Sequence, residues 1–154
     1  IAYGMPLGAM MARREVMTWG PGTHGSTIAG NPVAIAAGMA TLDLLEKTLV
    51  DNSARVGALL KARLAERLAG ATTVTEVRGI GLMIGVEFTS HAVAEAVAQL
   101  CFRRGLLVLE CGQKAIRISP PLILTDGQAD TIAEVFARAI ADAPAVSDAA
   151  HARA

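Results

Sequence analysis

The stretch TVTEVRGIGLMIGVEF, Thr73–Phe88, decides the fold of this chain. Apolar and polar residues alternate along much of it, and a period of two residues is typical of strands with one buried face. Gly79 and Gly81 interrupt the alternation and predict a tight connection. We therefore expect two strands, over 74–78 and 82–88, joined through these glycines.

The sequence after this stretch predicts the rest of a small α+β layer. Gly105 is suited to end a helix, and Gly112 to turn the chain between two short strands. The expected elements are a helix over 90–105, strands over 106–111 and 115–120, and a last helix from Thr125 or Asp126 to about Ala141. The order β-β-α-β-β-α predicts an antiparallel sheet with helices on one face.

The residues before Thr73 predict a short strand and then two helices. The strand is expected over 8–12, between glycine-rich turns. Asn31 is a good N-cap and Pro32 suits the first helical position, so a long helix should begin there. Apolar spacing extends this helix to about Leu49, and a second helix, capped by Asp51 or Asn52, to about Ala69.

Composition excludes several classes of protein. Hydrophobic residues make up 53% of the 154 residues and charged residues 18%, which predicts a packed core rather than disorder. Basic and acidic residues number 14 each without a basic patch, which argues against nucleic-acid and anionic-membrane partners. No apolar run approaches the roughly 18 to 20 residues of a membrane span, so we expect a cytoplasmic protein.

The two cysteines predict no special chemistry. Cys101 and Cys111 lack the spacing of a metal or redox site. We therefore expect reduced thiols and no bound metal, in keeping with a cytoplasmic compartment.

The stretch GPGTHGSTIAGNP, residues 20–32, could bind an anion. Ser26 and Thr27 supply hydroxyl donors, and Gly25 lets the backbone approach a ligand closely. The alternative is a connecting loop whose only task is to begin the helix at Asn31. The residues alone leave both interpretations open.

Arg117 is the second candidate binding residue. It lies in the apolar segment AIRISPP, so burial of its charge would be costly without an anionic partner. That partner could be a carboxylate of this chain, in a structural salt bridge, or the carboxylate of a ligand held by the guanidinium fork. Composition does not decide between them.

Four stretches together resemble a known family. They are GMPLGAMMARREVM (4–17), GTHGSTIAGNPVAIAAGMATLDLLE (22–46), VRGIGLMIGVEF (77–88) and GLLVLECGQKAIRISPPLILT (105–125). In this order and spacing they resemble the C-terminal part of class III aminotransferases, which use pyridoxal 5′-phosphate (PLP). The nearest likeness is to the 4-aminobutyrate aminotransferase group, and acetylornithine and ornithine aminotransferases look similar.

The resemblance implies a fold and a division into domains. The fold would be the α/β fold of PLP-dependent transferases, fold type I. Residues 1–45 would be the end of the large domain with the interdomain helix. Residues 46–145 would be the small C-terminal α+β domain, with an antiparallel sheet and helices on one face, and 146–154 a disordered or frayed tail.

The resemblance also assigns roles to individual residues. Thr27, supported by Ser26, would contact the phosphate of the neighbouring subunit's PLP across a dimer interface. Arg117 would bind the substrate carboxylate. The lysine that forms the Schiff base with PLP would lie just upstream of Ile1, so this chain itself would contain no catalytic residue and no metal site.

The function implied is transfer of an amino group from an amino acid to a 2-oxo acid. The donor would be of the 4-aminobutyrate, ornithine or acetylornithine type, and the enzyme a homo-oligomer, either a dimer or a dimer of dimers. We expect this chain alone to be inactive. Two alternatives stay open: an amino-acid racemase or aminomutase of the same fold, and a non-catalytic dimerising remnant of a broken gene.

Overall fold

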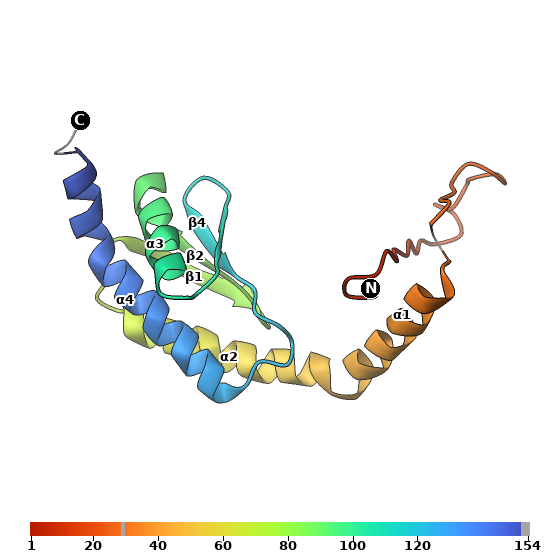
Figure 1. Cartoon of the computed structure of the whole chain (residues 1–154), viewed down its shortest axis with the longest axis horizontal. Coiled ribbons are helices and arrows are strands. Elements are labelled where there is room, and N and C mark those ends of the chain that lie inside the picture. Colours follow the sequence, from red (N-terminus) through yellow and green to blue (C-terminus); the bar gives the residue numbers. More distant parts are fainter. Residues whose placement is uncertain (29, 152–154) are drawn as a thin grey trace. The chain divides into compact units, whose positions relative to one another are not determined.

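The computed structural model describes residues 1–28 and 30–151, with side chains as far as Ala143 (Figure 1). The chain forms two compact units, Ile1–Leu49 and Val50–Ala154, and each is described by itself. The predicted division into domains between residues 45 and 46 stays a prediction.

The first unit is irregular up to Asn31 and helical after it. Helix α1 (Pro32–Leu44) begins as expected, because the Asn31 side chain accepts hydrogen bonds from the backbone N–H groups of Val33 and Ala34, at 2.9 and 3.3 Å. The strand predicted over 8–12 is wrong: no strand occurs in the described residues of this unit. A strand needs a neighbour to pair with, and nothing there supplies one.

The predicted break between two helices is also wrong. A π-helical segment, η1 (Leu45–Leu49), follows α1, and α2 (Val50–Leu68) follows η1 without a non-helical residue. Asn52 therefore does not cap a helix. Its amide Nδ2 instead donates to the carbonyl oxygens of Leu122 and Leu124, at 2.7 and 3.1 Å, a partnership across 70 residues that local sequence rules do not predict.

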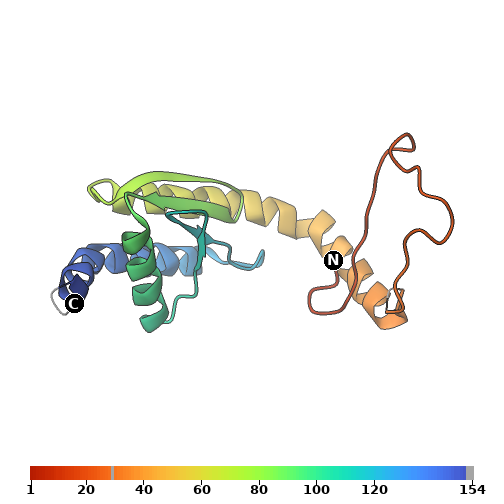
Figure 2. The ribbon, with the colours of Figure 1, turned by 90° about the horizontal axis from the view of Figure 1, so that it is seen from above.

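The second unit has the predicted order β-β-α-β-β-α after α2. Its elements are β1 (Val74–Ile80), β2 (Met83–Phe88), α3 (His91–Arg103), β3 (Leu109–Cys111), β4 (Ala115–Ile118) and α4 (Asp126–His151). The strands form one antiparallel sheet in the order β1-β2-β4-β3, and α2, α3 and α4 cover one of its faces (Figure 2). The expected α+β layer is confirmed.

The ends of the last two helices follow the predicted chemistry in part. Gly105, with φ +79°, lies just after α3 as expected. Thr125 and Gln128 form a reciprocal capping box at the start of α4: the Gln128 carbonyl oxygen accepts from the Thr125 N–H, and the Thr125 hydroxyl from the Gln128 N–H. Helix α4 continues beyond Ala141 to His151. The tail expected over 146–154 extends outside the described residues.

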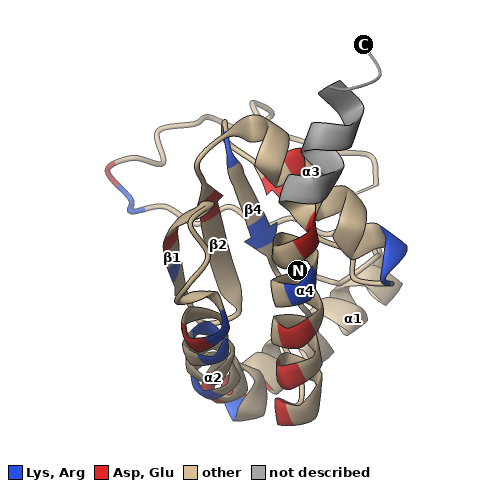
Figure 3. Cartoon of the chain, turned by 90° about the vertical axis from the view of Figure 1, so that its left-hand side faces the viewer, with Lys and Arg blue, Asp and Glu red and all other residues tan. Residues whose placement is uncertain are grey.

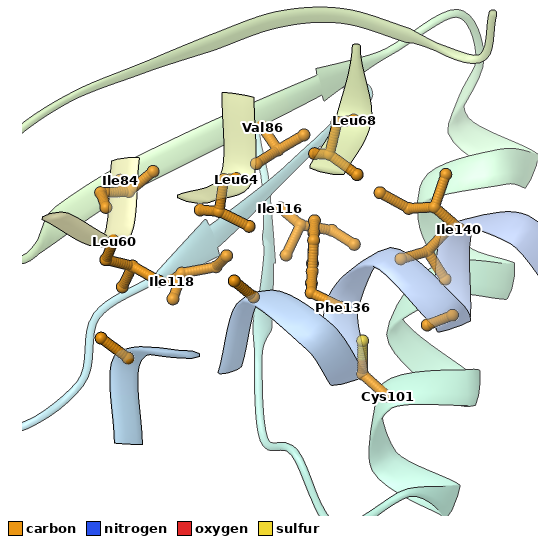
Figure 4. Packing of buried hydrophobic residues seen from close by; sticks show 14 of the residues in the cluster. Leu60, Leu64, Leu68, Ile84, Val86, Cys101, Ile116, Ile118, Phe136 and Ile140 are labelled. Carbon is orange, nitrogen blue, oxygen red and sulfur yellow. The ribbon is translucent and has the colours of Figure 1, made fainter. Parts of the chain in front are cut away.

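The core lies between the sheet and the helices (Figure 4). Ile84 of β2 is opposite Ile118 of β4, and Val86 is opposite Ile116. These four side chains are buried against apolar residues of α2, α3 and α4. Because side chains alternate along a strand, the residues between them lie on the helix-free face.

Charged residues join α2 to α4 at the surface (Figure 3). Arg55 lies 2.8 Å from Asp126, and Arg63 lies 2.9 Å from Asp130. Exposed pairs of this kind contribute about 0–1 kcal/mol each, so they help to align the helices while the core supplies the stability.

A backbone contact fixes the β1–β2 turn against α2. A Cβ atom on Gly57 would lie 2.1 Å from the carbonyl oxygen of Gly81, which itself has φ +53°. The backbone N–H of Leu82 donates to the Ser53 hydroxyl at 3.2 Å beside this contact. The helix and the turn can approach this closely because both positions are glycine.

We predict that Gly57→Ala destabilises the fold. Alanine raises helix propensity by about 1 kcal/mol, but the clash with backbone outweighs this, and we expect a net loss of about 1–3 kcal/mol in the free energy of unfolding. Urea denaturation followed by circular dichroism measures it. Gly127→Ala is the matched control, because nothing lies within 4 Å of a Cβ there. Equal stability of Gly57→Ala and the parent chain would contradict the contact.

We predict that Cys101 resists thiol reagents in the folded chain. Its side chain is fully buried, and burial raises the pKa of its thiol to about 11. The thiolate fraction at pH 8 is then on the order of one in a thousand, and the sulfur is also inaccessible. Iodoacetamide labelling read by mass spectrometry should modify the half-buried Cys111 first, and Cys101 only in denaturant. Native Cys111→Ser protein that labels readily at Cys101 would refute this.

Candidate functional site

Arg117 lies on the helix-free face of the sheet. It is on β4, between the core residues Ile116 and Ile118, so its side chain leaves the sheet on the opposite side from theirs. The strand register places Gly85 of β2 directly beside it, and Arg78 of β1 beside Gly85. A row of three neighbouring strands thus carries arginine, glycine and arginine.

The Nε atom of Arg117 is buried, and the described residues offer it no hydrogen-bond partner. They offer its guanidinium no carboxylate within 4.0 Å either. Arg63 Nε also lacks a well-aligned hydrogen bond, yet it lies 2.9 Å from an Asp130 oxygen and is therefore ion-paired. Within the described residues, the structural salt bridge considered for Arg117 is not formed.

Arg78 is in the opposite situation. Its guanidinium donates to carboxylate oxygens of both Glu87 and Glu76, at 2.7 Å each. These hydrogen bonds, that to Glu87 first, raise the pKa of the Arg78 guanidinium. Lys114 approaches Glu87 from β4's side at 3.8 Å. The acidic residues of this face are therefore already occupied by Arg78 and Lys114.

The segment after β4 is held in place from α2. Asn52 hydrogen-bonds two carbonyl groups of the segment, as described above, and Pro120 and Pro121 stiffen its beginning. An open pocket of about 480 Å³ lies against this segment and against α4, but its lining is mostly apolar and does not include Arg117. The pocket is thus separate from the guanidinium.

The second candidate site is the loop before α1. Thr27 is exposed, and its hydroxyl has no hydrogen bond to any described residue. The Ser26 hydroxyl accepts from the N–H of Ile28 at 3.4 Å, which leaves its own proton available for donation. Asn31 already satisfies two N–H groups of the helix, so an anion here would depend on the hydroxyls more than on the helix end.

The beginning of this loop is ordered by its own contacts. The rings of Trp19 and His24 stack with centroids 5.5 Å apart, and the Thr23 hydroxyl donates to the Gly20 carbonyl at 2.8 Å. Thr23 is thereby used within the loop, whereas Ser26 and Thr27 keep their donors available.

Sequence reasoning assigned Gly85 to close packing of a strand and missed its place beside Arg117. The register across β2 and β4 is the signal that reveals it, and register depends on long-range pairing. Loop and sheet belong to different compact units, so each candidate site is described separately.

Two searches of the described residues returned nothing. No helix there is long and apolar enough to cross a membrane. No group of three or more His, Cys, Asp and Glu side chains in that part of the chain is placed to hold a metal ion.

Comparisons with known proteins agree with the resemblance. The family described as aminotransferase class-III matches residues 1–140. Acetylornithine aminotransferase 1 of Bordetella pertussis is 41% identical over 138 residues, which cover 88% of this chain and 35% of that protein. Acetylornithine aminotransferase of Streptococcus mutans is 41% identical over 132 residues, 84% of this chain and 34% of its own length.

Solved structures show the same relation. The structure of Plasmodium falciparum ornithine delta-aminotransferase matches with a TM-score of 0.76 and 32% identity, covering 86% of this chain and 35% of that one. Plasmodium yoelii ornithine aminotransferase matches with a TM-score of 0.74 and 30% identity, covering 81% and 34%. The chain spans about a third of the length of the curated relatives it matches. It belongs to the class-III aminotransferase family, whose enzymes use pyridoxal phosphate.

Proposed function

We propose that the polypeptide containing this chain transfers an amino group from an amino acid to a 2-oxo acid. The observation that supports this most directly is Arg117, whose buried Nε has no partner among the described residues of a class-III aminotransferase chain. A guanidinium in this state is suited to pair with both oxygens of a carboxylate, which amino acids and 2-oxo acids share.

The role of Arg117 is to bind and orient. Two parallel N–H···O bonds fix the plane of a carboxylate, and a bound substrate then presents its reacting carbon in one orientation. The cost of partly burying the guanidinium is offset only when the anion is present. Binding should therefore depend on the fork geometry and not on positive charge alone.

Ser26 and Thr27 fit a phosphate. The phosphate of PLP carries nearly two negative charges, and both hydroxyls of this exposed loop can donate a proton to it. When bound, PLP supplies an electron sink for the carbanion chemistry of amino acids. We propose that these hydroxyls hold the phosphate of a PLP in the neighbouring subunit of a homodimer, and that a lysine outside this chain moves the proton.

The names of the relatives narrow the donor. Those matched at about 40% identity are called acetylornithine aminotransferases, and the structural neighbours include ornithine aminotransferases. We therefore favour an acetylornithine or ornithine donor over 4-aminobutyrate. The chain alone is proposed to be inactive.

We predict that Arg117→Lys weakens carboxylate binding in the polypeptide as its gene encodes it. Lysine keeps the charge and loses the fork, so KM for N-acetylornithine should rise at least tenfold while the denaturation midpoint stays unchanged. Steady-state kinetics with 2-oxoglutarate as acceptor measures it. Arg138→Lys, on the exposed face of α4, is the control. An unchanged KM would remove Arg117 from the site, and turnover without any 2-oxo acid would indicate a racemase or aminomutase.

We predict that Thr27→Ala weakens PLP binding. A hydrogen bond to a charged group contributes about 1.5–3 kcal/mol, so the dissociation constant of PLP should rise roughly ten- to a hundredfold. Fluorescence titration of the same polypeptide with PLP measures this. Thr18→Ala is the control in the same unit, since Thr18 lies outside the hydroxyl pair. Equal affinity of Thr27→Ala and the parent protein would contradict the role.

A further inference from the structure

Gly85 occupies the centre of the helix-free face. It lies on β2, one of the two inner strands of the sheet, with Arg78 beside it on β1 and Arg117 beside it on β4. Glycine in a strand interior costs roughly 0.5–1 kcal/mol relative to alanine, since it loses more conformational freedom on folding. A glycine here therefore calls for a reason.

The fold does not supply that reason. A Cβ atom on Gly85 would meet only the Arg78 side chain, at 3.8 Å from Cγ and 4.0 Å from Nε, which is ordinary van der Waals contact. Gly79, by contrast, has φ +154°, and a Cβ there would lie 2.3 Å from the Met83 carbonyl oxygen. Gly79 is required by the backbone, whereas Gly85 is not.

The charges around Gly85 favour an anion over it. The cations of this face are Arg78, Lys114 and Arg117, and the carboxylates are Glu76 and Glu87. Three positive charges against two negative charges leave one positive charge. Arg78 is saturated by its two carboxylates, so the surplus resides at Arg117, where the buried Nε lacks a partner in the described chain.

We propose that Gly85 is a specificity-determining residue, because it keeps the sheet surface beside Arg117 clear of side chains for the carboxylate of the substrate. Neighbouring residues of an antiparallel pair have Cβ positions about 4.5–5.5 Å apart, so any side chain at 85 would rise directly next to the Arg117 side chain. A branched side chain would occupy the space that a carboxylate needs. The proposal rests on the proposed function of Arg117.

The ligand class follows from this geometry. The face offers one unpaired guanidinium and no second unpaired cation among its described residues, so it fits a single carboxylate. The open surface over Gly85 makes the site sensitive to the bulk of the protein side chain, which distinguishes a ligand-bearing surface from a structural one.

The test is a series of variants in the polypeptide as its gene encodes it. The probe is glutarate, a dicarboxylate without an amino group, and its dissociation constant is measured by isothermal titration calorimetry. We expect Gly85→Ala to weaken binding about threefold and Gly85→Val at least tenfold. Denaturation midpoints are measured for every variant, and Gly127→Ala, distant from the sheet face in sequence and on α4, should bind glutarate like the parent protein.

The outcomes separate the two proposals. If Arg117→Lys weakens glutarate binding but Gly85→Val and Gly85→Ala do not, the role of Gly85 is refuted and that of Arg117 stands. If Arg117→Lys has no effect, or the parent protein does not bind glutarate, the carboxylate site itself fails. A denaturation midpoint lowered by Gly85→Ala with unchanged binding would show that Gly85 is structural and would overturn the inference.

Discussion

The alternation of side chains along β2 and β4 is the constraint on which this unit depends. Ile84, Val86, Ile116 and Ile118 must face the helices to close the core. With a period of two, the intervening residues are then committed to the other face. The hydrophobic effect thereby places Arg117 outside the core, although the segment around it is apolar.

Pairing of charges then distinguishes the two arginines of the same row. Arg78 has two carboxylates within hydrogen-bond distance, and its charge is neutralised within the sheet. Arg117 has a buried Nε and no such partner among the described residues. Because an unpaired and partly buried guanidinium is costly, its retention is best explained by a ligand that completes it.

The glycines of the second unit serve different physical purposes. Gly57 and Gly81 allow α2 and the β1–β2 turn to meet backbone to backbone, which positions the sheet edge. Gly85 has room for a side chain and carries none. Family membership is compatible with both uses, since a shared fold preserves the first and a shared chemistry the second.

The sequence by itself determined the local elements of the second unit and the family. Alternation in Thr73–Phe88, the glycine after α3 and the caps at Asn31 and Thr125 depend on neighbouring residues only, and they are confirmed. Only the tertiary structure decided that α2 continues from η1, because Asn52 bonds to carbonyl groups 70 residues away. It likewise decided that Gly85 lies beside Arg117, because strand register is set by long-range burial of the residues on the opposite face.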